Sequence, residues 1–190
     1  MGKLIKNMVA IDLEMNKPYG EIIQLGACWG DVTTGEVINT ASWYVATPYV
    51  IDPYITDLTG ITNADTTGAY SLPIVMDAYI MENKRVEEAH GEVFMNPLTW
   101  GGGDQQLIAS QLPPSWYDTR KWPFGRRWID VKTVFVSMRI AQGQPIQGGL
   151  AKSMTKVGLS FIGRKHNAEA DAYNTFVNYV ALLKKFKGGV

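Results

Sequence analysis

Two carboxylates stand two residues apart where an apolar run ends. Asp12 and Glu14 follow residues 8–11, Met-Val-Ala-Ile. Positions i and i+2 of a β-strand point to the same face, so we expect the two carboxylates to lie close together. Their mutual repulsion at the end of a buried strand calls for a proton or a bound cation. The pair is a candidate cation site, and the simpler alternative is a solvated strand end.

A histidine and an aspartate form a second candidate group near the C-terminus. His166 precedes Asp171 by five residues, in a loop that leads into a predicted helix. A carboxylate in the first turn of that helix can face the sheet. Imidazole exchanges protons near neutral pH, so His166 could act on a water molecule. The alternative is an exposed or capping histidine.

Asp104 is the third candidate. It follows Trp100 and three successive glycines, which remove side chains where a backbone or a ligand must approach closely. The alternative is an aspartate that only caps a helix.

These residues need strands and helices to hold them. Residues 22–29 and 37–45 are rich in β-formers and are joined by a turn bracketed by Gly30 and Gly35, which with the first strand predicts an antiparallel three-stranded meander. Two further short strands are expected at residues 93–100 and 128–131. We expect helices at residues 72–88, from 104 to before Pro113, at 132–141, 150–157 and 167–185, and an irregular segment that contains residues 57–62. The pattern predicts one α/β domain over residues 1–190, with a mixed five-stranded sheet flanked by helices.

The composition limits the classes of protein to which the chain can belong. The chain has 190 residues, 46% of them hydrophobic, which suffices for one substantial core. No apolar run approaches the roughly 20 residues of a membrane span, and no signal peptide is seen, so we expect a soluble, cytoplasmic protein. Cys28 is the only cysteine, so an internal disulfide or a thiolate zinc cluster is excluded and any metal would be held by oxygen or imidazole.

Charge is divided unevenly along the chain. Residues 1–115 carry 5 Lys/Arg against 14 Asp/Glu, whereas residues 116–190 carry 13 against 4. An acidic part that attracts cations and a basic part that attracts phosphates would suit a metal-dependent nuclease. Mutual neutralisation across an interface is the alternative.

The order of these features resembles that of the DEDDh exonucleases, the DnaQ-like or RNase T-like family. Residues 9–14, Val-Ala-Ile-Asp-Leu-Glu, look like its first motif, and residues 58–62 look like its Leu-Thr-Gly-Ile-Thr segment. Residues 100–104 are similar to the second motif, and residues 154–172 to the third. The resemblance spans nearly the whole chain.

The resemblance implies an RNase H-like fold and a 3′-to-5′ exonuclease that acts on a nucleic acid with a free, single-stranded 3′ end. It implies two Mg²⁺ or Mn²⁺ ions held by Asp12, Glu14, Asp104 and Asp171, with His166 as general base. Homodimers occur among relatives, but the sequence does not establish one here. A nucleic-acid-binding module without nuclease activity and a short-oligonucleotide hydrolase are the rival functions. The residue types do not decide between DNA and RNA.

Two groups of residues are candidates for substrate binding. The terminal nucleotide would contact Met15, Asn16, Leu58, Thr59 and Ile61, although Leu58 and Ile61 could equally be core residues. Residues 116–128 interleave aromatic and basic side chains, and there Trp122, Arg126 and Arg127 are candidates for single-strand contact. The alternative is that the tryptophans of this loop cover the core.

Overall fold

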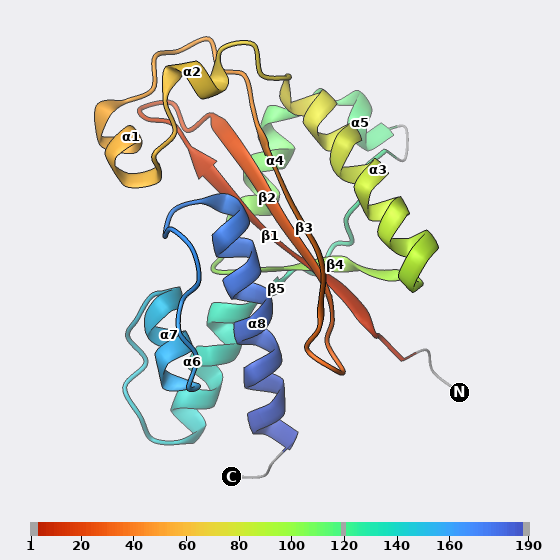
Figure 1. The fold of residues 1–190 in the computed structure, drawn as a ribbon, viewed down its shortest axis with the longest axis vertical. Coiled ribbons are helices and arrows are strands. Elements are labelled where there is room, and N and C mark those ends of the chain that lie inside the picture. Colours follow the sequence, from red (N-terminus) through yellow and green to blue (C-terminus); the bar gives the residue numbers. More distant parts are fainter. Residues whose placement is uncertain (1–3, 119–120, 188–190) are drawn as a thin grey trace.

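The computed structural model describes residues 4–118 and 121–187, and one five-stranded sheet organises them (Figure 1). Its strand order is β3-β2-β1-β4-β5. The first three strands form an antiparallel meander, and β4 and β5 are added parallel to β1, so the predicted mixed sheet is confirmed. The strands are β1 (Asn7–Met15), β2 (Ile22–Asp31), β3 (Val37–Tyr44), β4 (Val93–Thr99) and β5 (Ile129–Asp130).

Eight helices occur in the described part of the chain, and the five that were expected begin and end within about two residues of their predicted limits. The helices are α1 (Pro53–Thr59), α2 (Asn63–Thr66), α3 (Leu72–His90), α4 (Asp104–Gln111), α5 (Ser115–Asp118), α6 (Val131–Ala141), α7 (Leu150–Lys156) and α8 (Ala168–Lys187). Within this part, no helix has the length and apolar character to cross a membrane.

The expectation of an irregular segment at residues 57–62 was wrong for residues 57–59, which end α1, whereas residues 60–62 do connect α1 to α2. The Asp52 side chain accepts a hydrogen bond from Tyr54 N at the start of α1, and Gly60, with φ of 83°, ends that helix. Each helix is too short to show an apolar period, so only the capping residues signal it. The short α5 was likewise not expected in its loop.

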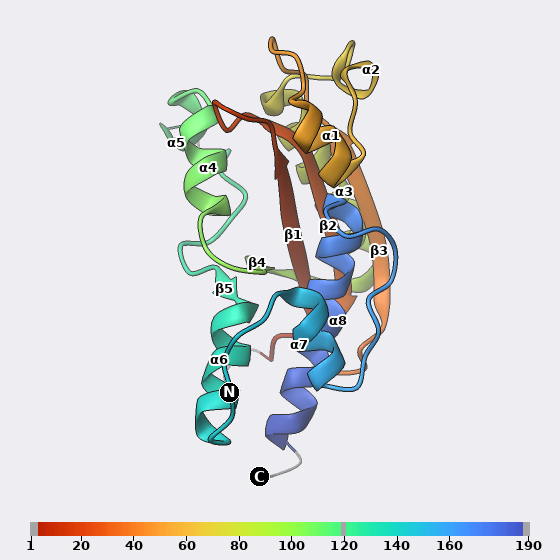
Figure 2. The ribbon, with the colours of Figure 1, turned by 90° about the vertical axis from the view of Figure 1, so that its left-hand side faces the viewer.

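The central strand β1 separates two core layers. Val9, Ile11 and Leu13 point to the face covered by α3, whereas Met8 and Ala10 point to the face covered by α6 and α8. This alternation follows from the two-residue period of a strand. Figure 2 shows α1 and α4 on either side of the C-terminal end of β1, where the acidic residues lie.

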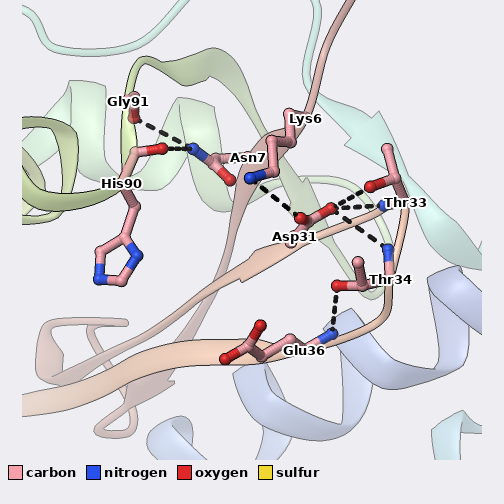
Figure 3. A network of polar contacts seen from close by, with 8 residues as sticks. All are labelled: Lys6, Asn7, Asp31, Thr33, Thr34, Glu36, His90 and Gly91. Carbon is pink, nitrogen blue, oxygen red and sulfur yellow. Dashed lines mark hydrogen bonds and ion pairs between the residues drawn. The ribbon is translucent and has the colours of Figure 1, made fainter.

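A polar network fixes the opposite end of β1 (Figure 3). Asp31 accepts hydrogen bonds from Thr33 N at 2.8 Å and Thr33 Oγ1 at 2.6 Å, which closes the β2–β3 turn, and it pairs with Lys6. Asn7 Nδ2 donates to the backbone oxygens of His90 and Gly91, at the end of α3. The start of the central strand is therefore tied to its neighbours on both sides.

Candidate active site

Asp12 and Glu14 lie near the C-terminal end of β1 and project from the face that carries α8. Glu14 is buried and Asp12 is half-buried. Burial and the nearby charge of Asp171 raise the pKa of Asp12 well above its usual value and that of Glu14 to about 8. The charge of Asp104 acts on both in the same direction. The site therefore concentrates more negative charge than the protein itself neutralises.

Asp171 reaches this cluster from the first turn of α8. One ligand atom from each of Glu14, His166 and Asp171 lies within 4.8 Å of the other two, a spacing that would suit one metal ion. Burial raises the pKa of Asp171, and the hydrogen bond that its Oδ2 accepts from His166 N at 3.0 Å partly offsets this effect. His166 is exposed and has a positive φ of 59°, a conformation uncommon for residues other than glycine and often found at functional sites.

The start of α8 is held by β2 and β3. Gln24 Oε1 accepts a hydrogen bond from Ala168 N at 3.1 Å, which satisfies one free amide of the helix N-terminus. The Glu169 carboxylate accepts hydrogen bonds from the hydroxyls of Thr40 and Ser42. These contacts set the position of the turn that carries Asp171.

Asp104 is the first residue of α4 and follows the glycine-rich turn. Gly101 and Gly103 have φ values of 98° and 118°, which favour glycine strongly. Burial, and then the charge of Asp130, raise the pKa of Asp104 to about 6. Asp130 Oδ1 also accepts hydrogen bonds from Gly101 N at 2.9 Å and Lys132 N at 2.9 Å, so it links the turn to the start of α6. Sequence reasoning missed Asp130, although an aspartate before a predicted helix is a recognisable cap signal.

A cavity of about 850 Å³ is lined by Asp12, Glu14 and Asp171, whereas Asp104 is not among its lining residues. Its walls come from the end of β1, the β1–β2 loop, α1, the start of α7 and the loop before α8. Met15, Leu58 and Thr59, for which nucleotide contact is predicted, are among its lining residues. The cavity is also lined by cationic and aromatic residues that were not predicted from the sequence to belong to the site: Lys17, Tyr54, Trp100, Lys152, Phe161 and Lys165.

Three of the candidate nucleotide contacts have structural roles. Thr59 is buried, and its hydroxyl donates a hydrogen bond to Ile55 O at 2.8 Å and accepts one from Ile61 N at 3.0 Å. Asn16 borders the cavity, but its side chain is fully buried and its amide bonds Val50 O at 3.1 Å and Asp52 N at 2.9 Å. Ile61 is buried in a cluster with Ile23, Ile51 and Ile55. Asn16 and Ile61 thus shape the cavity from behind its surface.

Four aromatic residues of the loop 116–128 cover the core: Trp116, Trp122, Phe124 and Trp128. Trp116 and Phe124 are buried, and Trp122 and Trp128 pack against the cluster that includes Val9 and Ile11. That cluster lies on the α3 face of the sheet, opposite to Asp12, so Trp122 is placed away from the carboxylates. Arg126 and Arg127 are exposed.

This geometry agrees with the comparisons to known proteins. The profile of the exonuclease family RNase_T matches residues 9–177, so the chain belongs to that family. Its class is that of the DEDDh 3′-to-5′ exonucleases, as the motifs predicted. The curated relative ERI1 exoribonuclease 2 of Danio rerio is 25% identical over 169 residues, which cover 82% of this chain and 30% of that relative.

Solved structures share the RNase H-like fold. The nuclease domain of 3′hExo, a DEDDh family member bound to rAMP, has a TM-score of 0.77 and 23% identity, and the match covers 95% of this chain and 93% of that one. Pop2p of S. pombe, in a Mg²⁺- and Mn²⁺-bound form, has a TM-score of 0.66 and 16% identity, with 96% and 85% covered.

Proposed function

We propose that the chain is a metal-dependent exonuclease that removes nucleoside monophosphates from the 3′ end of single-stranded DNA or RNA. The observation that carries this proposal is the convergence of four carboxylates from three separate parts of the chain, of which Asp12, Glu14 and Asp171 line one cavity and Asp104 acts on Asp12 and Glu14 by its charge. Asp12 and Glu14 come from β1, Asp104 from α4 and Asp171 from α8. Their raised pKa values mark a charge cluster that needs a cation to act as an ionised set.

The donor set fits hard divalent ions. Four carboxylates without a thiolate suit Mg²⁺ or Mn²⁺, and we infer two ions held by Asp12, Glu14, Asp104 and Asp171. The Mg²⁺- and Mn²⁺-bound form of Pop2p supports this choice. When bound, such ions would stabilise negative charge on the attacking and leaving oxygens of the phosphate.

His166 is the general base of this proposal. Its exposed imidazole stands at the edge of the acidic cluster, and its backbone is tied to Asp171. It would take a proton from a water molecule whose oxygen bonds to phosphorus, while the bond from phosphorus to the 3′ oxygen of the preceding nucleotide breaks and that oxygen is protonated. The products are a nucleoside 5′-monophosphate and a strand shorter by one nucleotide.

The cavity matches the size of the substrate end. Its volume of about 850 Å³ falls in the range of small-molecule sites. Met15 and Leu58 offer apolar contact to a base, and Lys152 and Lys165 offer positive charge to phosphates. The rAMP bound to the nuclease domain of 3′hExo supports a nucleoside monophosphate as the occupant.

The test is gel-resolved digestion of 3′-labelled and 5′-labelled single-stranded DNA and RNA with Mg²⁺, Mn²⁺ or EDTA. We expect a metal-dependent ladder that begins at the 3′ end, and its loss in Asp12→Asn and His166→Ala. The sugar preference follows from the same gels. Intact strands in every wild-type lane, from protein shown to be folded by circular dichroism, would instead favour a binding module.

A further inference from the structure

Exposed tyrosines gather beside the cavity, on the β1–β2 loop, on the segment that leads into α1 and on the first turn of α1. Tyr19, Tyr49 and Tyr54 are 68%, 46% and 56% exposed. The ring centroids of Tyr19 and Tyr49 are 4.6 Å apart, and Lys17 Nζ lies 4.7 Å from the centroid of the Tyr54 ring. We call Lys17, Tyr19, Tyr49 and Tyr54 the tyrosine patch.

The patch continues one wall of the cavity. Lys17, Pro18 and Tyr54 line the cavity, whereas Tyr19 and Tyr49 lie beyond it. The nearest acidic ligand in sequence, Glu14, precedes Lys17 by three residues. A strand whose last nucleotide occupies the cavity would therefore meet this surface if it leaves along that wall.

Buried polar contacts hold the two segments of the patch together. Asn16 begins the β1–β2 loop. Its side chain donates a hydrogen bond to Val50 O and accepts one from Asp52 N, both in the segment before α1. On its other side, Gly20 O accepts a hydrogen bond from Gln111 Nε2 at 2.9 Å. These hydrogen bonds hold the backbone to which the exposed rings are attached. The rings are therefore already arranged before a ligand binds.

We propose that the tyrosine patch binds the nucleotides upstream of the 3′ terminus by stacking their bases, with Lys17 beside their phosphates. This inference rests on the proposed function, because it assumes that the terminal nucleotide occupies the cavity. Aromatic rings next to basic groups are the means by which proteins hold single strands without reading sequence. A duplex offers no free base faces, since its bases stack on one another, so the patch selects an unpaired strand.

The test compares strand lengths. Cleavage of a dinucleotide and of a strand of about 12 nucleotides is measured as kcat/KM for wild type, for the double variant Tyr19→Ala/Tyr49→Ala and for Tyr19→Phe/Tyr49→Phe. We expect the alanine pair to lose at least about fivefold more on the long strand than on the dinucleotide, since stacking is worth that much per base. The phenylalanine pair keeps both rings and should retain long-strand cleavage.

Tyr70 supplies the matched control. It is 66% exposed but borders a different groove, with Trp43 and Ile74. Tyr70→Ala should leave the length dependence as in wild type. Equal losses on both lengths in the alanine pair, or the same selective loss in Tyr70→Ala, would overturn the proposal.

Binding separates this proposal from the nuclease function. Anisotropy of a fluorescent strand of about 12 nucleotides is measured with Mg²⁺ in the Asp12→Asn background. Weaker binding by the alanine pair supports the patch even if wild type cleaves nothing. Unchanged binding and unchanged long-strand cleavage by that pair, with an active wild type, overturn the patch and leave the nuclease function intact.

Discussion

Gly26 of β2 and Ala168 of α8 are in such close backbone contact that a Cβ atom added to Gly26 would lie 2.1 Å from the Ala168 carbonyl carbon. Gly26 is also the residue opposite Asp12 in the β1–β2 pair. One glycine therefore lets the turn that carries Asp171 approach the strand that carries Asp12.

Gly26→Ala should separate these two elements. The added methyl meets backbone and not a flexible side chain, so α8 must shift, and we expect a destabilisation of about 1–3 kcal/mol and a large loss of activity. Urea unfolding and nuclease rate measure the two effects. Gly102→Ala is the control for the unfolding measurement, because nothing lies within 4 Å of its added Cβ. Full activity in Gly26→Ala would contradict the role given to this contact.

Stability of the metal-free protein should fall as the pH rises. Carboxylates whose pKa is higher in the folded than in the unfolded state contribute stability that is present below the unfolded-state pKa and lost as the pH rises through the folded-state pKa. Burial first, and then neighbouring acidic groups, place the pKa of Glu14 at about 8 and that of Asp104 at about 6. In EDTA we expect Tm to fall from about pH 4 to about pH 8, and Glu14→Gln to reduce that fall.

Divalent ions should counteract the loss of stability that we expect at higher pH. They bind the deprotonated carboxylates, so the increase in Tm caused by Mn²⁺ should grow over the same pH interval. Thermal scans with Mn²⁺ or EDTA at each pH measure it. An Mn²⁺ effect that is equal in wild type and in Asp12→Asn/Glu14→Gln would show that the ion binds elsewhere.

Asp130 should act on Asp104 by charge and on α6 as a cap, and two substitutions separate these effects. Asp130→Asn keeps an oxygen acceptor for Gly101 N and Lys132 N but removes the charge, so the pKa of Asp104 should fall. Asp130→Ala also removes the cap and should cost about 0.5–2 kcal/mol of stability. Carboxyl NMR titration in EDTA and urea unfolding measure the two quantities. An unchanged Asp104 titration in Asp130→Asn would contradict the electrostatic link.

Arg164 should position the loop that carries His166. Its Nη2 donates to Asp57 O in α1 at 3.1 Å, and its guanidinium lies where a side chain on Gly60 would be. Arg164→Ala should lower kcat roughly tenfold, because a small displacement of His166 from the reacting water strongly slows the reaction. The same change should have much less effect on the free energy of unfolding. Arg164→Lys should restore part of that rate.

The control for Arg164 is Arg85→Ala, which removes another exposed arginine, on α3. We expect both proteins to unfold within about 1 kcal/mol of wild type. A similar loss of kcat in both variants would point to overall charge and not to the contact with α1.

The residue pattern along the chain predicted the mixed sheet and proposed the acidic residues of the candidate site. The period of two along residues 8–14 fixes which side chains share a face of β1, and glycines and prolines mark where strands and helices end. The order of Asp12, Glu14, Asp104, His166 and Asp171 along the chain is that of the DEDDh family.

The tertiary structure decided which side chains surround the cluster. The tryptophans of the loop 116–128 and Ile61 pack in or against the core. Lys17 and Tyr54, from segments far apart in sequence, line the cavity. Residue type does not settle such choices, because an aromatic ring is equally suited to covering a core and to stacking on a base. Only the packing of α1, the β1–β2 loop and α8 around β1 determines which rings are buried and which remain accessible to a ligand.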